Sequence, residues 1–129
     1  MSQENPTKSL RESMRTVREA DDFSYALRNF LDRFRRNPSI ALLQDEPETL
    51  TGLLQDDGLA DAYLASAAAL LCQENDMSCP PWVDDKSRIM KTPWFAANSP
   101  NLKAILLQES PAAFRIHNLF VSANALSRA

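Results

Sequence analysis

The stretch DDFSYALRNFLDRFRRNP, residues 21–38, decides the fold class of this chain. Its apolar side chains recur every three or four residues and so form one stripe along a helix: Phe23, Leu27, Phe30, Leu31 and Phe34. The two aspartates suit the positive end of a helix dipole, and arginines fill the last turn, where the dipole favours cations. Pro38 disfavours helical backbone at Asn37 and ends the helix. We therefore predict an amphipathic helix whose three phenylalanines lie in the core rather than in a ligand wall.

Two further regions carry clear helical patterns. Residues 59–73 are rich in alanine, and their apolar face comprises Ala60, Tyr63, Leu64, Ala67, Leu70 and Leu71. Near the C-terminus, Asn98 or Ser99 precedes Pro100, and Ser110 precedes Pro111; each pair joins an N-cap residue to proline in the first helical position. Helices are therefore predicted over 59–73, from Pro100 and from Pro111.

A basic segment opens the chain. A helix over residues 9–19 would place Arg11, Arg15 and Arg18 on one face, but it holds only three apolar residues. We therefore expect residues 1–20 to form a flexible basic arm or a loosely docked helix.

Two weaker patterns complete the chain. Pro47 suits the first position of a helix through Gln55, and Asp57-Gly58 would close that helix as a C-terminal glycine signal. The prolines of Cys79-Pro80-Pro81-Trp82 exclude a helix there, so residues 82–98 are expected to be irregular and to lay their aromatic side chains over the bundle.

These patterns together indicate an all-α fold. The chain contains only two glycines, and no stretch alternates apolar and polar residues as a half-buried strand does. Its 129 residues suffice for one core but not for two large ones. We predict a single compact bundle of about five to six helices over residues 21–129, with the irregular Trp/Pro-rich segment packed across it.

Composition narrows the class of protein further. Hydrophobic residues make up 44% of the chain and charged residues 24%, which is typical of a globular domain. No signal peptide is visible, and no apolar run reaches the length of about 20 residues that a membrane span needs. Two cysteines are too few for a disulfide framework. We therefore expect a cytoplasmic protein without membrane contact. Residues 38–85 hold ten acids and no base, whereas residues 86–129 hold six bases and one acid. These charges either neutralise one another across the fold or form an acidic and a basic face.

Signatures of catalysis and cofactor binding are absent from the sequence. Two glycines cannot build a phosphate-binding loop, and no Gly-x-Ser-x-Gly elbow occurs. The only histidine is His117, nothing in the sequence brings it to either cysteine, and no cysteine pair has metal-ligand spacing. We therefore assign no catalytic residue, no metal and no cofactor.

The aromatic segment and the C-terminal region are the favoured candidates for function. Trp82, Trp94 and Phe95 either cap the core or form a groove for a partner, since tryptophan is enriched at interaction hot spots. In the tail, Arg115, His117 and Arg128 either hold the chain terminus by hydrogen bonds or join that surface. We hypothesise a protein–protein interaction or regulatory module, with another protein or a second copy of the chain as its partner.

Two alternatives stay open. A nucleic-acid-associated protein could use the side chains of Arg11, Arg15, Arg18 and Arg28 on phosphates. The helix–turn–helix-like segment 48–73 argues against DNA reading, because its second helix has no lysine or arginine. A cofactor-free enzyme is the second alternative.

Near its C-terminus the chain contains Pro93-Trp94-Phe95-Ala96, then ESPAAF over residues 109–114 and NLFVSANALSRA over residues 118–129. This region resembles the C-terminal box of a family of uncharacterised bacterial proteins, some of which stand alone and some of which are linked to helix-turn-helix regulators. The resemblance covers about the last third of the chain. It implies a bacterial, cytoplasmic protein and favours a sensing or interaction module.

Overall fold

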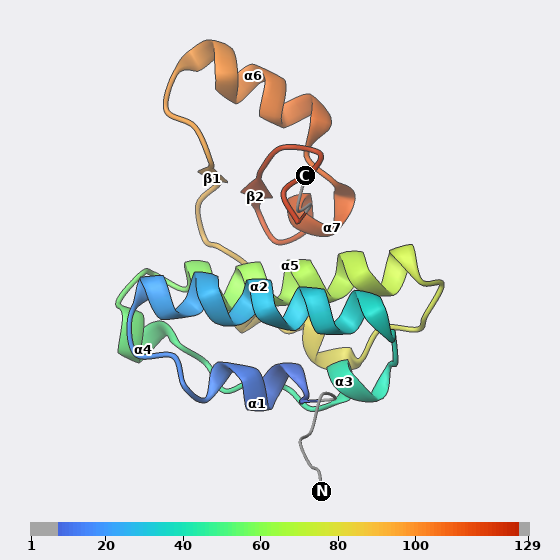
Figure 1. The fold of residues 1–129 in the computed structure, drawn as a ribbon. Coiled ribbons are helices and arrows are strands. Elements are labelled where there is room, and N and C mark those ends of the chain that lie inside the picture. Colours follow the sequence, from blue (N-terminus) through green and yellow to red (C-terminus); the bar gives the residue numbers. More distant parts are fainter. Residues whose placement is uncertain (1–7, 127–129) are drawn as a thin grey trace, which may run out of the picture. The chain divides into compact units, whose positions relative to one another are not determined.

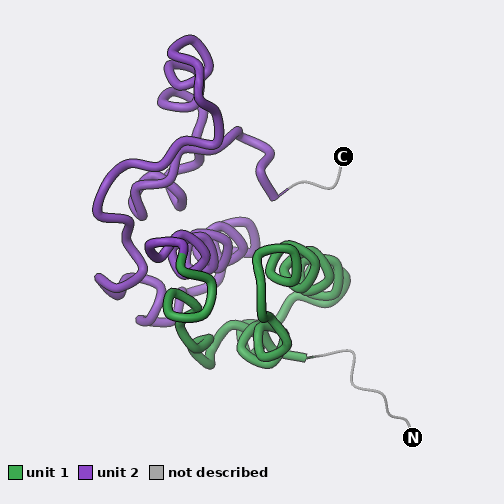
Figure 2. The backbone as a smooth tube through the Cα atoms, turned by 90° about the vertical axis from the view of Figure 1, so that its left-hand side faces the viewer, with its two compact units in different colours: residues 1–55 green, residues 56–129 purple. Residues whose placement is uncertain are grey.

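The computed structural model describes residues 8–126 and confirms the all-α class. Over those residues, seven α-helices and two short 3-10 helices accompany a single two-stranded sheet (Figure 1). The chain divides into two compact units between Gln55 and Asp56 (Figure 2). This boundary differs from the one predicted near residue 20, and each unit is described by itself below.

The first unit contains the predicted amphipathic helix as α2 (Ala20–Arg36). Four of the five stripe residues are buried as expected, and Phe23, near the start of the helix, is only half-buried. Phe30 and Phe34 are in tilted contact, with 5.9 Å between ring centroids. Helix α1 (Leu10–Met14) packs on α2 and on α3 (Ala41–Gln44), and α4 (Thr51–Leu54) follows. Leu10, Met14 and Val17 are buried, so the described part of the predicted arm belongs to the core.

Helix α1 is much shorter than the predicted helix 9–19, and the cap of α2 explains why. The Asp22 carboxylate accepts hydrogen bonds from the backbone N–H of Arg18 (3.0 Å) and Glu19 (3.2 Å). These bonds need Glu19 in extended backbone, with φ −145° and ψ 173°, so it cannot continue a helix from α1. The prediction that Arg11, Arg15 and Arg18 share one helical face was therefore wrong.

Gly58 serves the start of α5 (Leu59–Glu74) rather than the end of the preceding helix. Gly58 has φ 89°, a left-handed conformation that favours glycine, and its N–H donates to the Asp56 carboxylate at 3.1 Å. The same carboxylate accepts from the N–H of Ala60 at 2.9 Å. The helix predicted over residues 47–55 shrinks to the four residues of α4, which ends at Gln55 in left-handed backbone.

The second unit is layered around α5. After α5 come η1 (Pro81–Asp84), η2 (Lys86–Arg88), β1 (Trp94–Phe95), α6 (Pro100–Glu109), α7 (Ala112–Arg115) and β2 (Leu119–Phe120). Helix α5 contacts α7, η1 and η2; α7 and α6 both contact β2, which pairs in parallel with β1. Figure 1 shows α6 on the far side of this pair from α5, at the edge of the unit.

Local signals set both ends of α6. Ser99 caps it through a hydrogen bond from the Leu102 N–H to the Ser99 hydroxyl (3.2 Å), and Pro100 opens it, as predicted. Ser110 does not cap the next helix. Its hydroxyl instead donates to the Leu119 carbonyl and accepts from the Val121 N–H, both at 3.2 Å. Ser110 therefore holds the β2 segment in place, and α7 begins at Ala112, one residue later than a Ser110 cap would place it.

Candidate functional site

Trp82 lies inside the second unit. It is buried on η1, and the guanidinium carbon of Arg88 lies 4.9 Å from the centroid of its ring. Arg88 is itself fully buried, and its Nη1 lies 3.3 Å from the Asp61 carbonyl oxygen and 4.0 Å from the Asp61 carboxylate. Trp82 is thus a core residue in this structure, and its face is covered by a buried cation.

His117 is also internal, with 1% of its surface exposed. Its Nδ1 lies 2.7 Å from the Ala113 carbonyl oxygen and 3.1 Å from the Ser66 hydroxyl. Its Nε2 lies 2.8 Å from the Val83 carbonyl oxygen. The His117 side chain therefore links α5, α7 and η1. Its contacts match the hydrogen-bonding role that the sequence left open for the polar residues of the tail.

The Ser66–His117 contact does not make a nucleophile. Both side chains are buried, and the Ser66 hydroxyl donates to the Ala62 carbonyl at 2.8 Å. Both ring nitrogens of His117 face backbone carbonyls. A catalytic serine needs a hydroxyl that a substrate can reach and a base free to take its proton. The pair is therefore structural.

Trp94 and Phe95 lie side by side on β1 but point to opposite faces of the two-stranded sheet. The Trp94 N–H donates to the Asn118 carbonyl and the Ala96 N–H to the Phe120 carbonyl, both at 3.0 Å. Phe95 stacks on Phe120, with ring centroids 4.8 Å apart and planes 18° apart. Both aromatic residues of β1 are half-buried, and only Trp94 lines the groove described next.

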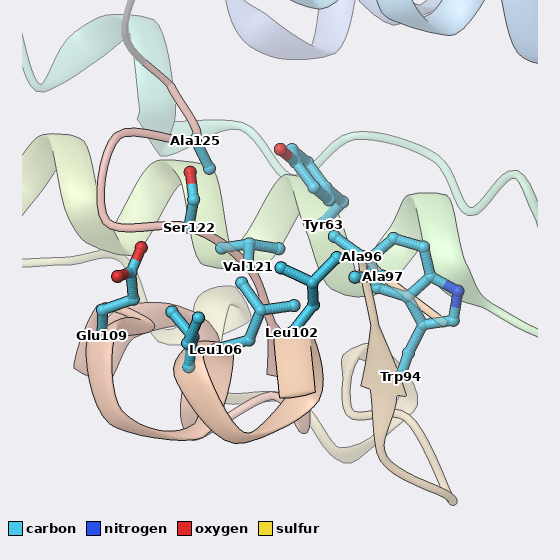
Figure 3. A pocket seen from close by; sticks show the side chains of 11 residues that line it. Tyr63, Trp94, Ala96, Ala97, Leu102, Leu106, Glu109, Val121, Ser122 and Ala125 are labelled. Carbon is cyan, nitrogen blue, oxygen red and sulfur yellow. The ribbon is translucent and has the colours of Figure 1, made fainter. Parts of the chain in front are cut away.

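A groove of about 440 Å³ runs between α6 and the segment after β2. Leu102, Ile105 and Leu106 line it from α6, Val121 from the opposite wall, and Trp94 and Tyr63 complete the apolar lining. Figure 3 shows Leu102, Leu106 and Val121 together, with Trp94 at one end and Glu109 and Ser122 at the other. We call this the α6 groove.

Helix α6 is unusually exposed for its composition. Leu106 is its only buried residue, whereas Leu102 is 50% exposed and Ile105 and Leu107 are each 49% exposed. Apolar side chains occupy more than one side of this helix, so packing on a single neighbour cannot cover them. The helix therefore presents a contiguous apolar surface to solvent along one wall of the groove.

Two groups in the groove carry chemical information. Burial raises the pKa of Tyr63 above its ordinary value of 10.0. The Tyr63 ring also meets Phe114 edge-on, at 5.1 Å between centroids, which fixes its position. The carboxylate of Glu109 accepts a hydrogen bond from the Ala123 N–H at 3.3 Å. The groove is therefore an apolar channel with a few polar atoms at its margins.

The remaining predicted partner-binding residues lie elsewhere. Arg115 is exposed at the end of α7 and does not line the groove, and Arg128 lies outside the described residues. Of the six residues predicted, the structure thus places one, Trp94, in the α6 groove. Sequence reasoning missed Leu102, Ile105 and Tyr63. The apolar excess of the α6 sequence was the signal that could have found the first two.

The arginines of the nucleic-acid alternative separate into two groups. Arg11, Arg15 and Arg18 surround a small pocket of about 120 Å³, whereas exposed Arg28 on α2 stands apart from it. Glu48 lines the same pocket, and its carboxylate lies 3.9 Å from the Arg11 guanidinium. The Arg18 guanidinium donates to the carbonyls of Arg15 (3.0 Å) and Val17 (2.9 Å). Two of these cations thus already have partners within the fold.

A polar hollow of about 320 Å³ lies between α1 and α2. The Arg33 guanidinium lines it, and its Nη2 donates to the Ser13 hydroxyl at 2.8 Å. The buried Nε of Arg33 has no hydrogen-bond partner among the described residues. Lys8 and Asp22 bring charges of opposite sign to the same hollow.

Within residues 8–126 no three His, Cys, Asp or Glu side chains gather closely enough to hold a metal ion. No helix in that range has the length and apolar character needed to cross a bilayer. Comparison of the chain with protein-family models, curated proteins and solved structures gave no match. The site is therefore interpreted from its own geometry.

Proposed function

We propose that this chain is a protein–protein interaction module, and that the α6 groove binds the apolar face of an amphipathic helix from another protein. The observation that carries the proposal is the exposure of α6. Leu102 and Ile105 line an open groove while half of each side chain faces solvent. Contiguous apolar surface of this kind on a soluble domain marks an interaction site.

The lining favours a protein segment over a small polar ligand. Leucine, isoleucine and valine form the walls, a tryptophan closes one end, and alanines at positions 96, 97 and 125 leave room for close approach. Helix-in-groove recognition uses this chemistry, with apolar anchors spaced three or four residues apart along the partner helix. Trp94 is the residue type most often found at the energetic centre of an interface.

The bacterial and cytoplasmic setting implied by the C-terminal resemblance belongs to the same proposal. A regulatory role would follow if the bound helix belongs to a transcription regulator, as the link of related proteins to such regulators suggests. Nucleic acid is not required, because the groove lining is mostly apolar and contains neither lysine nor arginine.

Capture of partners from nuclease-treated lysate of the source cell tests the proposal with a matched pair of variants. Ile105→Glu places a charge in the groove, whereas Leu107→Glu places the same charge on the same helix, at the same 49% exposure, outside the groove lining. We expect the wild type and Leu107→Glu to retain one stoichiometric protein, and Ile105→Glu to lose it. If both variants retained the partner protein equally, the α6 groove would not be its binding site. A partner that nuclease alone releases would also contradict the proposal.

A further inference from the structure

The two cysteines lie on either side of the chain reversal at the end of α5. The helix finishes with Asp76 in left-handed backbone, φ 56°. The Met77 N–H then donates to the Cys72 carbonyl (2.8 Å), and the Asp76 N–H reaches the Gln73 carbonyl (3.4 Å). This pair of bonds reverses the chain over the last helical turn in the Schellman arrangement. The chain therefore returns past Cys72 just before it reaches Cys79.

The far side of this reversal is anchored as well. Pro80 precedes η1, which begins at Pro81 and packs on α5. The Val83 N–H donates to the Pro80 carbonyl at 3.2 Å, and the Val83 carbonyl lies 2.8 Å from His117 Nε2. The segment that carries Cys79 is thus held against α5 from both ends.

The two thiols differ in their surroundings but interact. Cys72 is 2% exposed, whereas Cys79 is exposed to solvent, and both are free thiols. Burial, first, and then the neighbouring Cys79 side chain raise the pKa of Cys72 to about 12. Cys72 therefore stays a neutral thiol that solvent oxidants barely reach, beside a partner that they do reach.

We propose that Cys72 and Cys79 form a redox-active pair that hydrogen peroxide converts to an intramolecular disulfide. The Cys79 sulfur attacks one peroxide oxygen, so an S–O bond forms and the O–O bond breaks. The departing hydroxide takes the Cys79 proton and leaves as the first water. The Cys72 sulfur then attacks the Cys79 sulfenic acid; the S–S bond forms and the S–O bond breaks. The departing hydroxide takes the Cys72 proton and leaves as the second water. Two thiols lose two electrons to one peroxide.

The arrangement gives each cysteine one task. Cys79 is the thiol that meets the oxidant, and Cys72 is the resolving thiol, whose proximity makes up for its low thiolate population. The resulting disulfide closes the loop between the end of α5 and η1. A dithiol reductant restores both thiols, so the modification is reversible.

Intact-mass spectrometry of the full chain treated with hydrogen peroxide tests this pair. We expect wild type to lose two hydrogen atoms in mass and both free thiols, with full recovery after dithiothreitol. In Cys72→Ala, Cys79 should accumulate as sulfenic acid, trapped by dimedone, because the resolving thiol is missing. In Cys79→Ser, Cys72 should stay a free thiol, because it is buried.

Three outcomes would overturn the proposal. The first is wild-type protein in which both thiols stay free after peroxide has modified Cys79 of Cys72→Ala. The second is wild type in which Cys79 advances to sulfinic acid while Cys72 remains a thiol. The third is a dimer linked through Cys79. The exposed Cys79→Ser change keeps the test valid even if Cys72→Ala fails to fold, because that variant separates direct oxidation of Cys72 from oxidation through Cys79.

Discussion

Replacing His117 with phenylalanine removes every polar contact of a buried ring while it keeps an aromatic side chain of similar size. In the wild type, Nε2 lies 2.8 Å from the Val83 carbonyl oxygen and Nδ1 lies 2.7 Å from the Ala113 carbonyl oxygen. Ser66 keeps its bond to Ala62 in the variant, because its hydroxyl donates there at 2.8 Å. The substitution therefore affects mainly two carbonyls, both inside the second unit.

The magnitude follows from those two carbonyls. A buried polar group left without its partner costs about 1–3 kcal/mol. A carbonyl oxygen can accept a second bond, so we take the lower part of that range for each. We expect His117→Phe to lower the free energy of unfolding by about 3 kcal/mol, roughly a hundredfold in the equilibrium constant.

Urea unfolding followed by tryptophan fluorescence measures this loss, since both tryptophans lie in residues 56–129. Arg115→Ala is the matched control: Arg115 is exposed two residues away, so its change should stay within about 0.5 kcal/mol. A loss below about 1 kcal/mol in His117→Phe, with an unchanged urea dependence, would refute the assignment of the ring as a three-way link.

Four further substitutions should change stability in ways that the structure specifies. Gly52→Ala should stabilise the protein by about 0.5 kcal/mol, because Gly52 lies in α4 with nothing within 4 Å of an added methyl group. Gly58→Ala should destabilise the protein by about 1 kcal/mol, because the φ of 89° at Gly58 disfavours a side chain. Urea unfolding curves of the two glycine variants, measured side by side, give both changes in the free energy of unfolding. Changes of the same sign in the two variants would contradict the argument from backbone conformation. Asp61→Asn should lower the free energy of unfolding by about 3 kcal/mol, because it removes the carboxylate that lies 4.0 Å from buried Arg88. Asp57→Asn is the control and should change stability little, because Asp57 is exposed and has left-handed backbone. Equal shifts of the thermal unfolding midpoint in the two variants would count against a buried Asp61–Arg88 pair. Finally, the hydrogen bond from the Ser9 N–H holds the pKa of Glu12 below its ordinary value of 4.5. The stabilisation by the Glu12 carboxylate is therefore fully present above pH 4.5 and is lost as the pH falls through the lower pKa of Glu12 in the folded protein. Glu12→Gln should therefore weaken the acid dependence of the urea midpoint below about pH 4.5, and an unchanged dependence would show that the capping box is not formed.

The helices that could be predicted are those whose signals are local. The apolar stripe of α2, the alanine-rich run of α5 and the Ser99-Pro100 start of α6 each specify an element within a few residues of sequence. Where two local signals compete, the sequence does not show which one wins. The Asp22 cap of α2 holds Glu19 in extended backbone, and α1 stops at Met14, although residues 15–19 contain no helix breaker.

The site depended on contacts that no local pattern contains. His117 meets a carbonyl 34 residues earlier in the chain, and Arg88 meets Asp61 across 27 residues. Arg88 in particular looks like a surface residue in sequence, yet it is fully buried beneath Trp82. The same long-range packing covers Trp82 and leaves Leu102 and Ile105 open, so the partner-binding surface that we propose lies on α6 rather than on the whole predicted aromatic segment.

Site-specific photocrosslinking tests the α6 groove most directly. A photoreactive amino acid in place of Leu102 lies in the groove, and one in place of Ile116, which directly follows α7 and is 57% exposed, lies outside its lining. We expect the Leu102 position to crosslink to one amphipathic helical segment of a partner protein, and the Ile116 position not to crosslink to it. Crosslinking of that partner from Ile116 but not from Leu102 would contradict the proposal.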